Sequence, residues 1–294
     1  MVMALVFAIL APCIWAFMNV LDKYVIVHKV QKPLSFAAVA GLANLTIGVV
    51  LAIFLNWSDI QLKDTVFSVI SGILFGAQFF FYYLILQKED VSHFVGLLYI
   101  YPIIIAILSF LLLHERLSLF SYLGMIITLS GIVILSVRVS QLKWQTGIWM
   151  LISMIVVVSL YEFNIKVSTE KLPELNGVSI TGIFAGLTAL TILFKNENRR
   201  WFWSELKNIK WAYLIETFTF LGILTTYLAM SGLSATIVSS MASIQPLAVL
   251  LFESAMERKF GKMTRDKSFR HKLLPLSLVV VGIFLLYLPE ALKR

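Results

Sequence analysis

Apolar residues run along this chain in long stretches that are separated by short polar connections. A helix that crosses a lipid bilayer needs about 20 mostly apolar residues. Ten stretches meet this length and predict ten membrane-spanning helices: 2–22, 34–57, 66–87, 92–113, 119–137, 147–166, 175–194, 211–230, 233–254 and 273–289. We interpret the first stretch as a retained span, because no basic segment precedes it as in a signal peptide.

Composition supports a membrane protein and excludes other classes. Of the 294 residues, 60% are hydrophobic and 14% are charged, and the mean hydropathy is +0.90. Soluble domains carry about 25% charged residues, so a soluble globular or disordered chain is excluded. Cys13 is the single cysteine, which excludes an intrachain disulfide. The expected fold class is therefore an all-α polytopic membrane protein with ten transmembrane helices.

The formal net charge of +8 comes from cations in the connections between the apolar stretches. Connections on one predicted side carry 18 of the Lys and Arg residues, and the opposite side carries six. The positive-inside rule then places both termini outside, with the chain in a plasma or bacterial inner membrane. Lipid headgroups explain these cations without a nucleic-acid partner, because no basic domain is present.

The chain contains an internal repeat that divides it into 1–140 and 141–294. Tyr83–Pro102 and Tyr227–Pro246 share the same spacing, and each is followed by a Glu-Arg pair and an apolar stretch with a Gly-Ile pair. The Glu-Arg pairs are Glu115-Arg116 and Glu257-Arg258. Five spans per half is an odd number, so the halves would insert with opposite orientations. Inverted five-helix repeats of this kind are typical of secondary transporters.

These motifs resemble the EamA-like proteins of the drug/metabolite transporter superfamily. The residues that match are Tyr83, Pro102, Glu115-Arg116-Leu117, Gly124 and Gly131 in the first half, and Tyr227, Pro246, Glu257-Arg258 and Gly282 in the second. The second half departs from the pattern at Lys259, where Leu is usual, and in a basic insertion at about 261–271. The resemblance implies a ten-helix carrier of small metabolites with a central cavity. It also implies cytoplasmic termini, which is opposite to the orientation that the Lys and Arg count predicts.

Ionisable residues inside the spans are candidates for substrate or proton binding, because charges in hydrocarbon are costly. Glu162 is the first candidate, with an ion pair to Lys166 as the alternative interpretation. Glu216 is the second candidate. Asp22-Lys23 and Glu253 stand at span ends, and we expect them at the membrane interface.

Uncharged polar and aromatic residues extend this candidate list. Asn19, Asn164, Gln78 and Gln245 each need a partner in lipid, either another helix or a substrate, whereas Asn44 is expected to join helices. Pro102 and Pro246 each free a backbone carbonyl one turn earlier and shape their helices. Five aromatic residues are candidates for a cage around an organic cation or aromatic solute: Trp15, Tyr82, Tyr99, Tyr161 and Tyr227.

Small residues predict where the helices pack closely. Pairs of glycines stand four or seven residues apart in three spans: Gly41 with Gly48, Gly72 with Gly76, and Gly182 with Gly186. Such pairs let two helix backbones approach each other.

Catalytic and nucleotide-binding motifs are absent from the sequence. It has no H-E-x-x-H, G-x-S-x-G, Walker or G-x-G-x-x-G motif, so we expect no enzyme activity, cofactor or bound metal. The expected function is secondary transport of a small organic metabolite or drug-like solute by alternating access. The drive would be protons, an exchanged solute or the substrate gradient. Alternatives are a nucleotide-sugar or sugar-phosphate antiporter of the same superfamily, a non-transporting membrane receptor and an intramembrane enzyme. The expected partners are a small-molecule substrate and the bilayer, with the protein a monomer or homodimer.

Overall fold

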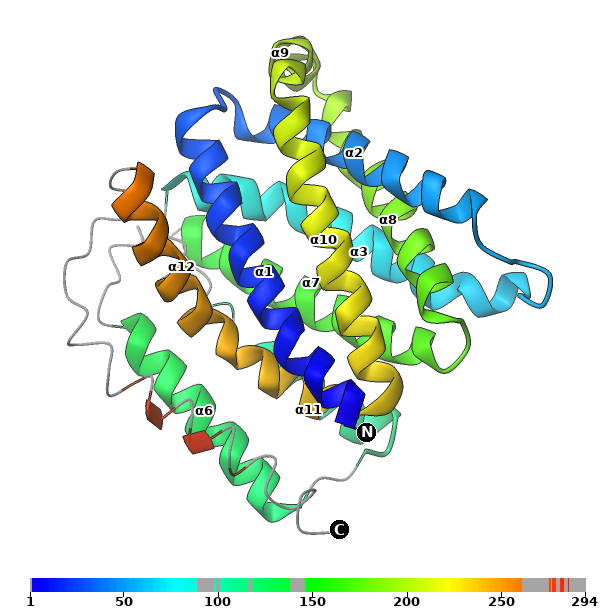
Figure 1. The fold of residues 1–294 in the computed structure, drawn as a ribbon, viewed down its shortest axis with the longest axis vertical. Helices are drawn as coiled ribbons and strands as arrows, with labels where there is room; N and C mark the ends of the chain where they lie inside the picture. Colours follow the sequence, from blue (N-terminus) through cyan, green and yellow to red (C-terminus); the bar gives the residue numbers. More distant parts are fainter. Residues whose placement is uncertain are drawn as a thin grey trace.

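The structure is a computed structural model that describes residues 2–88, 98, 101–115, 118–137, 146–260, 275, 277–278, 281–282 and 285. In this part of the chain, regular secondary structure is entirely helical (Figure 1). The first half contributes α1 (Val2–His28), α2 (Pro33–Ile53), α3 (Leu62–Lys88), α5 (Tyr101–Leu112) and α6 (Leu119–Val137). The second half contributes α7 (Thr146–Thr169), α8 (Glu174–Leu190), η1 (Thr191–Phe194), α9 (Asn196–Glu205), η2 (Leu206–Asn208), α10 (Ile209–Gly232), α11 (Ala235–Met241), η3 (Ala242–Ile244) and α12 (Gln245–Phe260).

Seven helical segments in the described residues are long and apolar enough to cross a membrane, and α5 and the start of α6 form shorter apolar helices. The protein is therefore a multi-pass membrane protein. Nine of the ten predicted windows coincide wholly or partly with these helices. Most of the tenth window, 273–289, and the start of the fourth lie outside the described residues, as does the basic insertion at 261–271.

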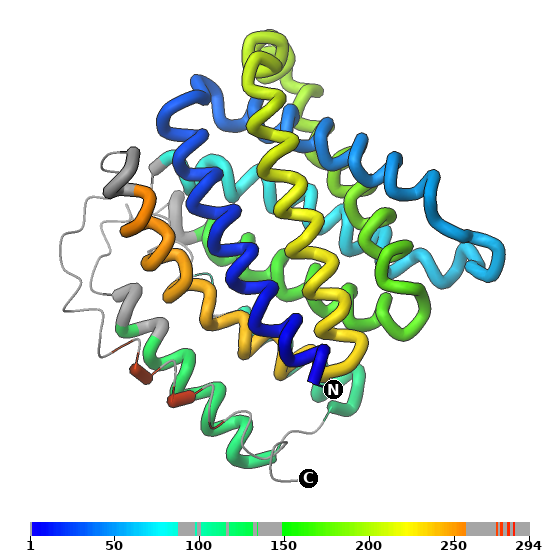
Figure 2. Tube along the Cα trace, in the orientation of Figure 1, coloured from blue at the N-terminus to red at the C-terminus, as the bar shows by residue number. Residues whose placement is uncertain are grey.

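One predicted boundary is wrong. The first span does not end at Asp22 but continues as a helix to His28. The connection 195–210 is mostly helical, because α9 and η2 occupy most of it and lead directly into α10 at one end of the bundle (Figure 2). Glu205, buried at the end of α9, accepts backbone hydrogen bonds from Gln31 (2.9 Å) and Lys32 (3.0 Å) between α1 and α2.

Glycines bring α8 into close contact with both α2 and α3, as their spacing predicts. A methyl group added at Gly186 would lie 2.5 Å from the carbonyl oxygen of Gly41 and from the backbone nitrogen of Leu45. A methyl group at Gly76 would lie 2.4 Å from the carbonyl oxygen of Ala185. We call this three-helix contact the α8 seam. Backbones this close leave no room for a side chain, so the seam is solidly packed.

The other helices surround a second region of the bundle. The 27-residue α1 packs against α10 and α12, and α7 packs against α3 and α5. Helices α1 and α10 run side by side in opposite directions (Figure 1). The span that contains α11 and α12 is interrupted by η3, which ends immediately before Gln245 and Pro246. Pro246 has no backbone N–H to donate one turn back, which suits an interrupted helix.

Candidate functional site

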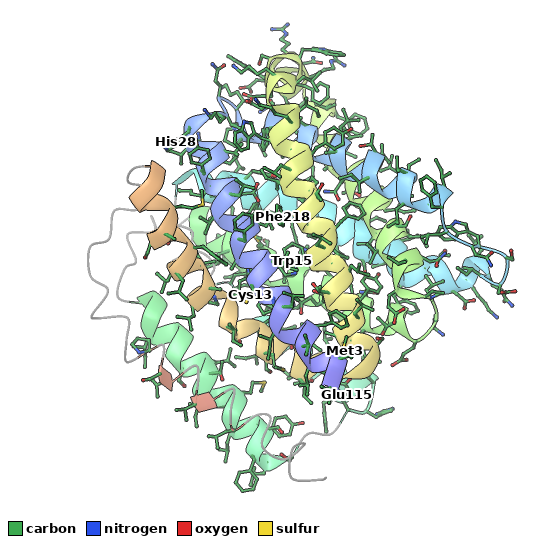
Figure 3. All side chains as sticks on the ribbon, in the orientation of Figure 1. Met3, Cys13, Trp15, His28, Glu115 and Phe218 are labelled. Carbon is green, nitrogen blue, oxygen red and sulfur yellow. The ribbon has the colours of Figure 1, made fainter. Side chains whose placement is uncertain are left out.

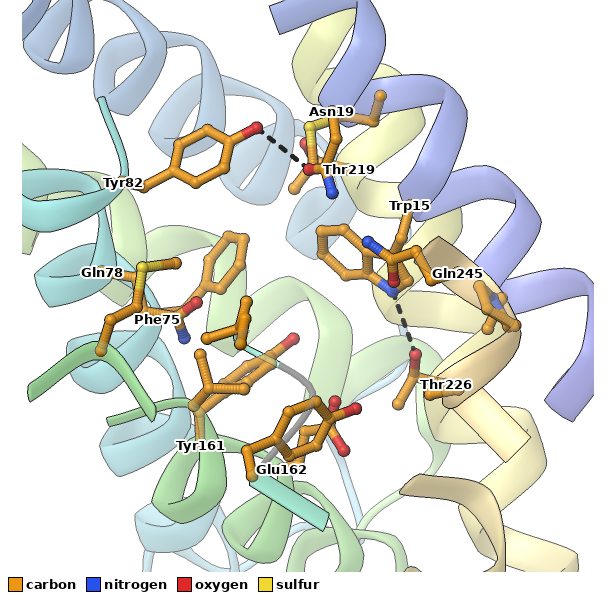
Figure 4. A pocket seen from close by; sticks show the side chains of 18 of the residues that line it. Trp15, Asn19, Phe75, Gln78, Tyr82, Tyr161, Glu162, Thr219, Thr226 and Gln245 are labelled. Atoms are coloured by element: carbon orange, nitrogen blue, oxygen red, sulfur yellow. Dashed lines mark hydrogen bonds between the residues drawn. The ribbon is translucent and has the colours of Figure 1, made fainter. Parts of the chain in front are cut away.

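A cavity lies between α1, α3, α5, α7, α10 and the interrupted span α11–α12 (Figure 4). It provides about 100 Å³ of space in which the centre of a water molecule fits. One water needs roughly 10–15 Å³ by this measure, so the cavity has room for several waters or one small organic solute. Trp15, on the cavity wall, stands at the middle of α1, between Met3 at one end and His28 at the other (Figure 3). The cavity is therefore at mid-depth of the bundle.

Asp22 and two tyrosines form one polar cluster on the cavity wall. The hydroxyl of Tyr82 donates to two acceptors, Asp22 Oδ2 (2.9 Å) and Asn19 Oδ1 (3.0 Å). The hydroxyl of Tyr83 donates to the other carboxylate oxygen, Asp22 Oδ1 (3.3 Å). Adjacent tyrosines of α3 thus satisfy both oxygens of an α1 carboxyl group, which is 1% exposed.

Glu216 of α10 is a second buried carboxyl group on the wall, also 1% exposed. Asn44 of α2 donates to its Oε2 (2.5 Å), and Thr219, one turn along α10, also hydrogen-bonds to it. Glu216 lies close enough to Asp22 for the two carboxyl groups to interact electrostatically. Asn44 does join helices, as expected, and its partner is a cavity residue.

Glu162 of α7 is the third carboxyl group on the wall, and its surroundings differ. Tyr101 of α5 hydrogen-bonds to Glu162, but Glu162 Oε2 has no hydrogen-bond partner among the described residues. The hydroxyl of Tyr161 and the amide nitrogen of Gln78 also lack partners within the described part of the chain. All three residues line the cavity. Tyr161 and Glu162 lie on the side away from Tyr82 and Asn19, and Gln78 lies beside Phe75 (Figure 4). Buried polar atoms are normally paired, so these groups are available to a bound molecule or to water.

Aromatic rings line the apolar part of the wall. The ring of Phe75 lies 6.0 Å from that of Trp15, 5.1 Å from that of Tyr161 and 5.5 Å from that of Phe79, measured between centroids. The indole nitrogen of Trp15 donates to Thr226 Oγ1 (3.4 Å), which fixes the ring against α10. Ring faces and edges of this kind suit a compact organic solute.

Acidic side chains line the described part of the cavity wall without a basic one. No Lys, Arg or His occurs among the described residues that line it. The nearby Lys23 donates to the carbonyl oxygen of Leu86 (2.7 Å). Lys166 donates to the carbonyl oxygen of Met230 (3.0 Å) and approaches Glu170 (3.9 Å), so it does not form the pair with Glu162 that the spacing allowed. The described residues contain no cluster of His, Cys, Asp and Glu that would hold a metal ion.

The structure places most of the candidate residues on the cavity wall. Eight of them line it: Trp15, Asn19, Gln78, Tyr82, Tyr161, Glu162, Glu216 and Gln245. Asn164 instead donates to the carbonyl oxygen of Leu160 (2.7 Å) in its own helix. Tyr227 is packed between α3, α8 and α10, where its hydroxyl contacts Thr181 (3.0 Å) and Ser68 (3.4 Å). Tyr99 lies outside the described residues.

Two expectations about charged residues at span ends are wrong. Asp22 and Lys23 are 1% and 5% exposed, and Asp22 belongs to the cavity. Glu253 is 3% exposed, within α12. Charge alone suggested an interface position, but α1 continues past Asp22 and α3 covers it. The sequence did contain one indication of a buried hydrogen-bond acceptor. Tyr82 and Tyr83 place two hydroxyl donors side by side in an apolar stretch.

Comparison with known proteins finds a family similarity in the first half of the chain. Residues 2–137 match the EamA-like transporter family. This EamA-like region contains α1, α2, α3, α5 and α6, of which α1, α3 and α5 line the cavity. The match supports the expected superfamily and a general role in transport.

The fold extends over the whole chain in a solved structure. That structure, entitled "Crystal structure of protein", superposes with a TM-score of 0.69 at 16% sequence identity, covering 96% of this chain and 98% of the other. At this identity the likeness concerns the fold alone. The superposition covers the second half of the chain as well as the EamA-like region. None of the curated proteins matches the chain.

Proposed function

We propose that this protein is a secondary transporter that moves a small organic solute across the membrane by alternating access. The observation that carries the proposal is the cavity at mid-depth of an apolar bundle. Glu162, Tyr161 and Gln78 line it, each with a polar atom that has no partner among the residues that the structure describes. Polar groups at this depth are costly unless they bind something. The EamA-like region, a match to a transporter family, supports the same function.

Helix packing supports two structurally related halves. If the first to third spans correspond to the sixth to eighth, contacts should occur in reciprocal pairs. The first span packs on the eighth as α1 on α10, and the sixth packs on the third as α7 on α3. The second and seventh spans, α2 and α8, pack on each other. We propose that these are inverted repeats, 1–140 and 141–294, and that movement of one against the other opens the cavity to each side in turn.

A sugar-phosphate antiporter is disfavoured by the electrostatics of the cavity. A phosphate group needs Lys, Arg or backbone N–H donors. The described cavity wall offers three carboxyl groups and no basic side chain, and Lys166 contacts Met230 instead.

Transport is tested with purified protein in liposomes loaded with a mixture of amines, amino acids, nucleosides and hexose phosphates. Mass spectrometry then identifies solutes that leave faster than from protein-free liposomes. We expect one chemical class to leave faster, and Glu162→Gln to slow its release at least about tenfold, the rate equivalent of about 1.4 kcal/mol. Glu170→Gln is the matched control, because Glu170 directly follows the same helix, α7, and its side chain is 55% exposed. Equal release from protein-free and protein-containing liposomes for every solute would contradict the proposal.

A further inference from the structure

The charge of the cavity points to its substrate. Resting on the proposed transport function, we infer that the solute is a small organic cation, an amine or quaternary ammonium with a compact apolar body, and that Glu162 binds its positive group. The carboxyl groups of Asp22, Glu162 and Glu216 line one small space, and no basic side chain of the described wall opposes them. A carboxylate in this space attracts a cation and repels an anion.

Hydrogen bonding separates the roles of the three carboxyl groups. Both oxygens of Asp22 accept from tyrosine hydroxyls, and Glu216 accepts from Asn44. Glu162 Oε2 has no partner in the described part of the chain. A bound ammonium group supplies N–H donors or positive charge to this oxygen without breaking an existing bond. Glu162 is therefore the anchor, and the Asp22–Glu216 pair is the secondary acidic site.

The wall beside Glu162 suits the rest of such a cation. Tyr161 precedes Glu162 in α7 and also lines the cavity. Its ring packs on the ring of Phe75, with an angle of 30° between the two planes. Phe75 in turn contacts Trp15 edge to face. Aromatic faces attract cations through their quadrupole, even a quaternary ammonium that has no N–H to donate. The cavity of about 100 Å³ limits the body to a small solute.

The inference is tested with four compounds that share a benzyl body and differ in charge: benzylamine, benzyltrimethylammonium, benzyl alcohol and benzoate. Binding to the purified protein in detergent is measured by calorimetry and by the thermal shift that a ligand causes. We expect the two cations to bind at least about tenfold more tightly than benzyl alcohol, a difference of about 1.4 kcal/mol, and benzoate to bind most weakly. Tighter binding of benzyl alcohol or benzoate, or binding of none of the four, would overturn the inference.

Variants test the assignment of Glu162. Glu162→Gln should weaken binding of benzyltrimethylammonium about tenfold, whereas Glu170→Gln should leave it unchanged and Asp22→Asn should weaken it about threefold or less. A larger loss in Asp22→Asn than in Glu162→Gln would overturn the assignment. The charge series on the unmutated protein keeps the test valid if a variant fails to fold.

The binding and transport experiments fail independently. Binding of cations without faster release of any solute would contradict the transport function while the cation site stands. Faster release of a neutral or anionic solute, with no binding of cations, would contradict the cation inference while the transport function stands.

Discussion

The α8 seam and the cavity are built on two faces of one helix, α3. Gly72 and Gly76, four residues apart, face α8 and leave no space for a methyl group. Phe75, Gln78, Phe79 and Tyr82, at positions i, i+3, i+4 and i+7 of one helical face, line the cavity. Because these sets differ in phase along a helix of 3.6 residues per turn, one helix presents a packing face and a binding face. Glycines on one face of α3 permit close packing against α8. Polar and aromatic side chains on the other face line the cavity.

The largest expected effect is on the seam. Gly186→Ala places a methyl group 2.5 Å from backbone atoms of Gly41 and Leu45, which cannot move without separating α2 from α8. Overpacking a tight contact costs about 1–3 kcal/mol, and we expect about 3 kcal/mol because the clash is with backbone. Thermal unfolding in detergent measures the loss. Leu187→Ala is the control, because Leu187 is 46% exposed on the outer face of the same helix. Equal stability of the two variants would show that the seam is not tightly packed.

A smaller effect is expected at Asn44, which connects the two regions. Asn44 belongs to α2 of the seam, and its amide donates to Glu216 on the cavity wall. Asn44→Ala leaves a buried carboxyl oxygen without this donor, so we expect a loss of about 2 kcal/mol in stability. Cation binding should change by less than about threefold, because Glu162 is untouched. A tenfold loss of binding at unchanged stability would instead place Asn44 in the binding site.

The smallest of these effects is the pH dependence of binding in the cavity. Lowering the pH from about 8 to about 5 adds protons to carboxylates, so binding of benzyltrimethylammonium, whose charge is permanent, should weaken about tenfold. The hydroxyl groups of Tyr101 and Tyr161 face Glu162. The other titratable groups nearby are further away: Asp22, Glu216, Tyr227 and, one turn along α7, Lys166. In Glu162→Gln the dependence should largely disappear. Calorimetry at both pH values measures it, and stronger binding at the lower pH would contradict the account.

The sequence predicted the helices well, because apolar length is a local property. It also predicted the glycine contacts of Gly41, Gly76 and Gly186, since only small residues permit such approach. It could not predict which face of each helix turns inward. Asn164 follows Glu162 by two residues, about 200° around the helix, and thus points away from the cavity. The burial of Asp22 depends on hydroxyl groups about 60 residues away, a long-range contact that the pattern around Asp22 does not contain.

The central claim is that the cavity opens to each side of the membrane in turn and favours cations. Cys13 is the single cysteine, so Gln78→Cys in a Cys13→Ser background places one thiol on the cavity wall. The measurement is the labelling rate of this thiol in liposomes by membrane-impermeant thiosulfonates, one carrying trimethylammonium and one carrying sulfonate, added to either face. We expect labelling from both faces, with the cationic reagent faster. Labelling from one face alone, or faster labelling by the anionic reagent, would contradict it.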